Sequence, residues 1–113
     1  MGLILRTYRG CLDSSAIEGL VYAKELVGFS YARRTVWRMQ FTDRNRVMFT
    51  YESGRREENI WTVKGTKIYL RNPANGRLIG TRKLCIRGKH LEWVSGSGKR
   101  LGRILALEET PVE

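Results

Sequence analysis

The sequence lacks the features on which membrane proteins and exported proteins depend. No apolar run approaches the roughly 20 residues that a membrane-spanning helix requires. The apolar stretch at residues 3–5 has no charged segment before it and is too short for the core of a signal peptide. We therefore expect a cytoplasmic protein with no signal peptide and no membrane partner.

Residues suited to catalysis or metal binding are equally scarce. The two cysteines, Cys11 and Cys85, are too few for a disulfide framework, and we expect two separate thiols. His90 is the only histidine, and it lies five residues from Cys85 across a predicted turn, which is a poor arrangement for a nucleophile and its base. One His and two Cys do not complete a four-ligand zinc site. We predict no enzymatic activity, no cofactor and no metal.

Positive charge is what the chain has in excess. Its formal net charge is +10, and residues 29–103 hold eighteen Lys and Arg against five acids. Such an imbalance favours a polyanionic partner or an acidic protein surface, with plain solubility as the alternative. At 113 residues and 42% apolar composition, the chain is expected to form a single domain over residues 1–113 with a real core.

The first part of the chain predicts one strand and one helix. Residues 3–8 have the composition of a short strand. Ser15 and Glu18 form a capping-box pattern, and apolar residues then recur at helical spacing up to Val27, followed by Gly28 as a C-terminal stop. We therefore predict a helix over residues 15–27 that covers the end or edge of a sheet.

The rest of the chain has the rhythm of hairpins. Turn-forming clusters recur at residues 42–45, 52–54, 64–66, 72–76, 87–89 and 95–98. Between them, apolar residues alternate with polar ones, which predicts seven strands. The alternating sets are Thr35, Trp37, Met39 and Phe41; Val47, Phe49 and Tyr51; Trp61 and Val63; Ile68 and Leu70; Leu78, Leu84 and Ile86; Leu91 and Trp93; Leu101, Leu105 and Leu107.

Strands joined in this order by short turns form an antiparallel up-and-down meander. Closing the meander on itself removes its exposed edges. The predicted fold class is therefore all-β with one N-terminal α-helix, in which about seven to eight strands form a small barrel or half-barrel. Residues 1–28 supply the N-terminal strand and helix, residues 29–107 the meander, and residues 108–113 a flexible tail.

Three segments carry a resemblance to a known family. They read LVGF at residues 26–29, VWRMQF at 36–41 and IWTVKGTKIYL at 60–70. This pattern resembles the small bacterial lipocalin-like domains of the calycin group over residues 26–107, with Phe29 or Ser30 where those domains carry an entry tryptophan. The resemblance implies a barrel-like β-meander.

Two arginines share the phase of inward apolar residues. Arg82 is in phase with Leu84, and Arg103 with Leu101. Inward guanidinium groups would require an anion or carboxylate partner. The alternative is that bulges near Gly80 and Gly102 shift the phase, or that both side chains reach solvent.

Basic residues also lie beside aromatic ones. A sheet surface with a tyrosine between cations is suited to stacking bases and contacting phosphates, without sequence readout. A solvated, cation-decorated face is the alternative. The predicted polyanion-binding residues are Arg33, Arg34, Arg38, Lys67, Tyr69 and Arg71.

The leading functional prediction is a non-enzymatic binding module for an anionic partner, with nucleic acid as the first choice. The alternative is a lipocalin-like carrier or sensor that holds a small anionic amphiphile inside the barrel. The predicted cavity residues for that alternative are Trp37, Phe49, Trp61, Arg82, Trp93 and Arg103. A third possibility is an adaptor or inhibitor that docks on an acidic protein, and an unclosed meander favours a homodimer through its edges.

Overall fold

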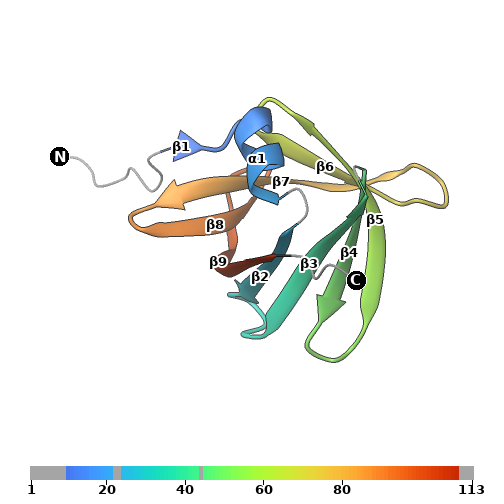
Figure 1. Ribbon diagram of the computed structural model, residues 1–113, viewed down its shortest axis with the longest axis horizontal. Helices are drawn as coiled ribbons and strands as arrows, with labels where there is room; N and C mark the ends of the chain where they lie inside the picture. Colours follow the sequence, from blue (N-terminus) through green and yellow to red (C-terminus); the bar gives the residue numbers. More distant parts are fainter. Residues whose placement is uncertain (1–9, 22–23, 44, 110–113) are drawn as a thin grey trace.

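The computed structural model describes residues 10–21, 24–43 and 45–109 (Figure 1). The strand expected at residues 3–8 lies outside this part of the chain. The described elements are β1 (Gly10–Cys11), α1 (Ser14–Val21), β2 (Lys24–Ser30), β3 (Val36–Asp43), β4 (Arg46–Tyr51), β5 (Arg56–Lys64), β6 (Lys67–Arg71), β7 (Leu78–Arg87), β8 (His90–Ser95) and β9 (Arg100–Glu109).

Strands β2 to β9 form a closed antiparallel barrel. Each strand pairs with the next along the chain, and β9 pairs back onto β2 to close the ring. The all-β class and the up-and-down meander of the sequence analysis are thereby confirmed. Strand β1 is additional, and it pairs with the stretch of β7 that lies beyond the end of β6. Strand β9 continues to Glu109, two residues into the expected tail.

The predicted helix is correct at its start and wrong at its end. Helix α1 ends at Val21, and residues 24–30 form strand β2. The cap also differs, because Asp13 Oδ1 accepts the hydrogen bond from the Ala16 backbone N–H at 2.9 Å, in place of the expected capping box at Ser15 and Glu18. Strand β2 hydrogen-bonds to both β3 and β9, and this pairing outweighs a local helical pattern.

Gly28 is therefore not a helix stop. It lies in β2 directly opposite Trp37 of β3, and a Cβ atom at this position would collide with the Trp37 indole. The glycine lets the ring lie flat against the strand, so its role is to place an aromatic side chain inside the barrel.

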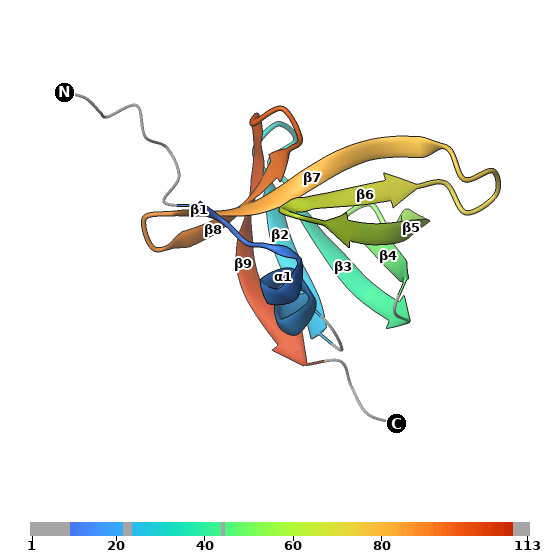
Figure 2. The same cartoon turned by 90° about the horizontal axis from the view of Figure 1, so that it is seen from above.

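Helix α1 covers one end of the barrel (Figure 2). Ile17 is fully buried and joins the core cluster, which also includes Met39, Val47, Trp61 and Leu84. The helix packs against β2 and β5, as the predicted cover of the end of the sheet requires. In the described part of the chain, no helix has the length and hydrophobicity to span a bilayer.

The two cysteines form a disulfide, contrary to the expectation of separate thiols. Cys11 of β1 lies opposite Cys85 of β7, although 74 positions separate them in the sequence. The prediction failed because the pairing depends on β1, whose two residues carry no strand pattern. A disulfide is typical of oxidising compartments, so the predicted cytoplasmic location stays a prediction with an observation against it.

Bulges shift the inward phase of two strands. In β9 the register slips opposite Val27 and Gly28, so that Ile104 packs on the core while Leu105 and Leu107 are exposed. In β7 it slips opposite Leu70 and Arg71, next to Ile79. The inward assignment of Leu78, Leu105 and Leu107 was therefore wrong, because one extra residue changes the phase of the strand. Ile86 keeps the phase of Leu84 but is exposed, in the part of β7 that extends beyond the end of β6.

Candidate functional site

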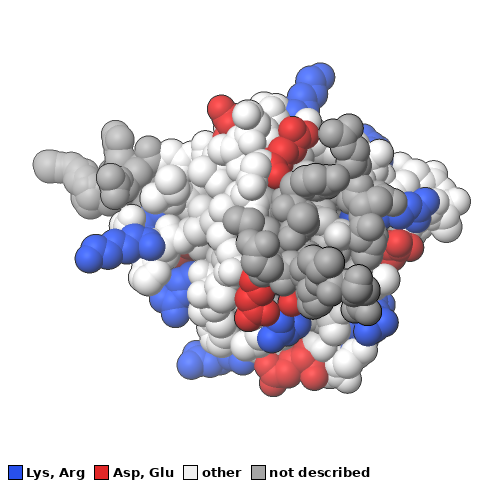
Figure 3. Space-filling model, viewed as in Figure 1, with Lys and Arg blue, Asp and Glu red and all other residues white. Residues whose placement is uncertain are grey.

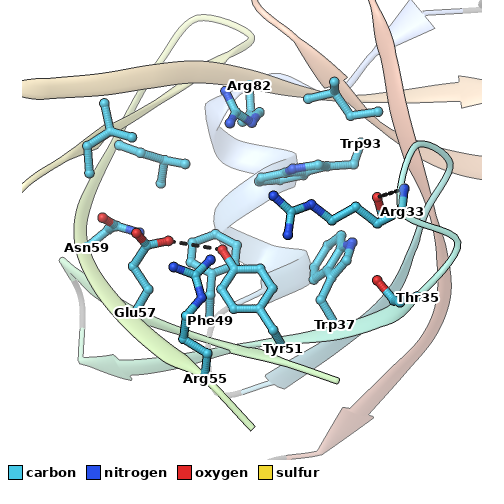
Figure 4. A pocket seen from close by; sticks show the side chains of 14 residues that line it. Arg33, Thr35, Trp37, Phe49, Tyr51, Arg55, Glu57, Asn59, Arg82 and Trp93 are labelled. Carbon is cyan, nitrogen blue, oxygen red and sulfur yellow. Dashed lines mark hydrogen bonds between the residues drawn. The ribbon is translucent and has the colours of Figure 1, made fainter. Parts of the chain in front are cut away.

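A cavity of about 230 Å³ opens at one end of the barrel (Figure 4). In an up-and-down barrel, alternate hairpins meet at the same end, and the β2–β3 and β4–β5 loops lie at this one, opposite α1. We call this end the mouth and the end covered by α1 the base. The cavity is lined by Ser30, Arg33, Thr35, Trp37, Phe49, Tyr51, Arg55, Glu57, Asn59, Leu70, Ile79, Arg82, Trp93 and Leu101.

Arg82 projects from β7 into this cavity. Its Nη1 donates a hydrogen bond to the Thr81 backbone carbonyl at 2.9 Å, and no carboxylate pairs with it among the described residues. Burial lowers the pKa of Arg82 below its ordinary value, although an arginine stays charged at physiological pH. A partly buried cation without a carboxylate is costly, and an incoming anion would offset that cost.

Gly80 makes room for the Arg82 side chain. It shares the inward face of β7, and a Cβ atom there would lie 2.7 Å from Arg82 Nη1. The strand thus places a small residue beside a large charged one at the cavity wall. Any side chain at position 80 would push the guanidinium out of its present position.

Three aromatic rings form an apolar wall of the cavity. The Trp37 ring centroid lies 5.7 Å from that of Trp93 and 6.2 Å from that of Phe49, and the Phe49 and Trp93 centroids are 6.5 Å apart. The three side chains come from β3, β4 and β8 and are all at least nine-tenths buried. They present a rigid aromatic surface beneath Arg82.

Polar groups lie beside this aromatic wall, since the Tyr51 ring stacks on Phe49 with centroids 6.4 Å apart. The Tyr51 hydroxyl donates to Glu57 Oε1 at 3.0 Å, and Arg55 Cζ lies 4.6 Å from the centroid of the Tyr51 ring. Burial, followed by the hydrogen bond to Glu57, raises the pKa of Tyr51. With Arg33, Arg55 and Arg82 against Glu57, cations predominate around the space.

Asn59 is the least satisfied polar side chain of the cavity. It is 3% exposed, and its Oδ1 atom has no hydrogen-bond partner. It lies on the inward face of β5, two residues from the buried Trp61. A buried acceptor without a donor is rare in proteins and calls for an explanation.

The loops around the mouth form a basic rim, defined here as residues 30–36, 51–57, 71–78 and 95–100. These residues include eight cations and only two carboxylates. The cations are Arg33, Arg34, Arg55, Arg56, Arg71, Arg77, Lys99 and Arg100, and the carboxylates are Glu52 and Glu57. The chain's excess of positive charge is thus strong where the cavity opens to solvent.

A buried carboxylate anchors the β2–β3 loop at this rim. Glu92 on β8 is 2% exposed and accepts hydrogen bonds from the Tyr31 hydroxyl at 2.6 Å and from Arg100 Nη2 at 2.7 Å. The bond to Glu92 is the main cause that raises the pKa of Arg100. This network fixes the loop that carries Arg33 against β8 and β9.

The six residues predicted to bind polyanions do not gather on one face. Arg38 lies on the outer face of β3, where its Nη1 atom contacts Glu25 at 3.0 Å and Glu108 at 3.1 Å. Lys67, Tyr69 and Arg71 belong to β6, which β4 and β5 separate from β3. Arg33 and Arg34 lie in the β2–β3 turn, and Arg33 lines the cavity. On the face drawn in Figure 3, Lys and Arg are scattered among acidic residues.

Four of the six predicted cavity residues line the cavity, namely Trp37, Phe49, Arg82 and Trp93. Trp61 is buried deeper, where its ring packs edge-on against Phe41 with centroids 4.6 Å apart. Arg103 lies on the outward face of β9 opposite Glu92, because the strand has Leu101 and Ile104 on its inner side. The alternative considered for Arg103, a bulge that shifts the phase, fits this placement.

The predicted cavity set lacked most of the polar residues that line the cavity, namely Ser30, Arg33, Thr35, Tyr51, Arg55, Glu57 and Asn59. A signal for two of them was present, because Glu57 and Asn59 share the phase of Trp61 and Val63 along one strand. That phase places them inside the barrel, where polar side chains are unexpected.

The cysteine–histidine pair is not a catalytic arrangement, since Cys85 is held in the disulfide with Cys11. Within the described ranges, no three His, Cys, Asp or Glu side chains lie together as metal ligands. Comparisons with protein-family models, with curated proteins and with solved structures gave no match. The lipocalin-like resemblance is therefore supported by the closed eight-stranded barrel alone.

Proposed function

We propose that this protein is a non-enzymatic, lipocalin-like binding protein that holds a small anion in its barrel. The observation that carries the proposal is Arg82, an inward cation with no carboxylate partner among the described residues, at the wall of a 230 Å³ cavity. A charge in such a site binds an oxyanion more strongly than an exposed charge does, because less water competes for it.

The basic rim supports the same function from outside. Two of its eight cations, Arg33 and Arg55, line the cavity itself. A mouth with charge of one sign raises the local concentration of oppositely charged ligands and speeds their association. The wall of Trp37, Phe49 and Trp93 would hold the apolar part of the ligand.

The size of the cavity limits the ligand. A volume of 230 Å³ corresponds to about eight water molecules at roughly 30 Å³ each. The occupant is therefore a molecule of about ten non-hydrogen atoms inside the barrel, and a longer amphiphile would extend through the mouth.

The nucleic-acid hypothesis has less support than the cavity. Its residues are spread over β3, β6 and the β2–β3 turn, and Arg38 is already paired with two glutamates. The basic rim alone would give weak, salt-dependent attraction to any polyanion.

Isothermal titration calorimetry with a panel of small carboxylates and sulfonates tests the proposal. We expect at least one to bind the wild-type protein, and Arg82→Gln to weaken that binding tenfold or more, because a charge-assisted hydrogen bond is lost. Arg103→Gln, which removes an equal charge from the outer face, is the matched control and should leave the affinity within about twofold.

The nucleic-acid hypothesis is tested in parallel by measuring the binding of labelled oligonucleotides by fluorescence anisotropy. If no small anion binds while oligonucleotides bind equally well to wild type and Arg82→Gln, the cavity is not the site and the surface charge is. Equal anion affinity in the wild type and Arg82→Gln would also overturn the proposal.

A further inference from the structure

Two features of the cavity have not been accounted for by anion binding alone. Asn59 Oδ1 is buried without a hydrogen-bond donor, and three aromatic rings cluster on one wall. An anion on Arg82 satisfies neither of them. Both are explained if the ligand brings a hydrogen-bond donor and a flat ring in addition to its charge.

The unpaired acceptor defines the first requirement. An amide oxygen in the interior loses its water partners on folding and is usually given another donor. Asn59 has an inward position on β5 and lines the cavity, so a bound molecule would lie against this side chain. The complementary group is a hydroxyl or amino donor.

The positions of Asn59 and Arg82 define the second requirement. They come from β5 and β7, with β6 between them, so their strands are about 10 Å apart at roughly 4.8 Å per strand spacing. Arg82 Nη1 lies beside Gly80, which is opposite Leu70 of β6, and Leu70 is opposite Trp61 of β5. The guanidinium is therefore level with Leu70 and Trp61, and Asn59 lies two residues nearer the mouth along β5. The cation and the amide come from different strands, so one ligand needs two separate polar groups to meet both.

The aromatic rings and Glu57 set the third requirement on the ligand, which concerns its shape and its charge. The rings of Trp37, Phe49 and Trp93 offer faces and edges for offset stacking, which favours a flat aromatic ring over a flexible chain of equal volume. Glu57 stands at the cavity with its Oε1 bonded by the Tyr51 hydroxyl. A second negative charge on the ligand would meet this carboxylate, which favours a monoanion.

We propose that the cavity takes a flat aromatic monocarboxylate that carries a hydroxyl or amino donor, with the carboxylate on Arg82 and the donor on Asn59 Oδ1. This inference rests on the proposed function, in which Arg82 holds an anion. It adds the ring, the single charge and the donor as three requirements that a binding experiment separates.

The test compares benzoate, 3- and 4-hydroxybenzoate, 4-methoxybenzoate and terephthalate by calorimetry. We expect one hydroxybenzoate to bind at least tenfold more tightly than benzoate, because only the former supplies the missing donor. The methoxy compound, which has an acceptor but no donor, and terephthalate, with its second charge, should bind more weakly than that hydroxybenzoate.

Asn59→Leu gives the decisive comparison, since it removes the acceptor at similar volume. The ratio of the hydroxybenzoate affinity to the benzoate affinity should fall to about onefold. Thr62→Val, a change on the exposed outer face of the same strand, is the matched control and should keep the full preference. Circular dichroism checks that both variants are folded, and Asn59→Asp provides a second variant, which should weaken every carboxylate by repulsion.

The outcomes separate this inference from the function on which it rests. If acetate, phosphate or aliphatic acids bind through Arg82 while no benzoate binds, the anion site stands and the aromatic assignment is wrong. If benzoates bind with equal affinity whether or not they carry a donor, Asn59 does not accept a hydrogen bond from the ligand. The same conclusion follows if Asn59→Leu keeps the preference for the hydroxybenzoate over benzoate. If no anion binds at all, both proposals fail together.

Discussion

The two halves of the barrel interior differ in chemistry although the same strands build both. Along the inward face of β5, Glu57 and Asn59 lie toward the mouth, whereas Trp61 and Val63 lie toward the base. The same change occurs in β7, where Arg82 lines the cavity and Leu84 is fully buried. One continuous strand thus passes from a polar site to an apolar core within two residues.

The base of the barrel stabilises the fold, whereas the mouth has the groups suited to binding. At the base, Ile17 of α1 closes a core of tightly packed apolar side chains. At the mouth, the loops are left open and carry the basic rim. The base has the burial that stabilises the fold, and the mouth has the unpaired polar groups that cost stability and serve a ligand.

The largest loss of stability is expected from a substitution in the core at the base. Leu84→Ala removes a side chain with no exposed surface and leaves a void among packed residues, which should lower the free energy of unfolding by about 2–5 kcal/mol. Leu107→Ala makes the same chemical change on the exposed side of β9 and should cost well below about 1 kcal/mol. Urea denaturation of both variants checks this, and equal losses would contradict a core located at the base.

A smaller loss of stability is expected where the two halves meet. Gly28→Ala drives a Cβ atom into the Trp37 ring, which Phe49 and Trp93 hold from the other side, at a cost of about 1–3 kcal/mol. Because Trp37 is a cavity wall, ligand binding should weaken as well. Tryptophan fluorescence and urea denaturation measure the two effects.

The control for Gly28→Ala is Gly19→Ala. A Cβ atom at Gly19 meets nothing within 4 Å, and alanine favours a helix over glycine, so this change should stabilise the protein slightly. A Gly28→Ala protein that is as stable as Gly19→Ala would mean that Trp37 moves aside freely.

Alternation and turns were sufficient to predict the meander, because hairpin order follows from local sequence. Strand β2 was missed since the spacing of its apolar residues also suits a helix, and only its hydrogen bonds to β3 and β9 decide between the two. The disulfide was missed for a related reason, as it depends on the pairing of a two-residue strand with β7.

The candidate site was predictable only where the phase of a strand is undisturbed. Arg82 was placed correctly from its phase with Leu84, whereas Arg103 was misplaced because β9 changes register opposite Trp93 and Val94, where Leu101 is the extra residue. Bulges of one residue leave little trace in composition, yet they reverse every later side chain. The inward position of Asn59 follows from its phase with Trp61 in an undisturbed strand, so it was predictable from the sequence.

Arg82→Leu should raise the stability of the protein, whereas the substitutions at the base should lower it. Replacing a partly buried, uncompensated charge with a leucine should raise the free energy of unfolding by about 1 kcal/mol while it abolishes anion binding. Arg103→Leu on the outer face should change stability by less than about 0.5 kcal/mol and leave binding intact. Thermal denaturation and calorimetry of the two variants test this, and a marked loss of stability in Arg82→Leu would show that the charge has a structural partner.

The smallest change in stability is expected at alkaline pH, where tyrosines near the mouth ionise. The pKa values of Tyr31 and Tyr51 are both raised above the ordinary 10.0, mainly by burial and next by the hydrogen bonds donated to Glu92 and Glu57. Since the unfolded tyrosines ionise first, the stability that these two groups contribute is fully present below pH 10 and is lost as the pH rises through their folded-state pKa values.

Tyr51→Phe should therefore lose less stability than the wild type between pH 9 and pH 11, by less than about 1 kcal/mol in urea denaturation, because only one hydrogen bond is involved. Tyr69→Phe, on the outer face of β6, is the matched control and should follow the wild type. An ionised Tyr51 would also stand beside the bound anion, so ligand affinity should decline over the same pH range in the wild type and less in Tyr51→Phe. If stability falls alike in all three proteins while affinity stays constant, Tyr51 does not couple the mouth to pH.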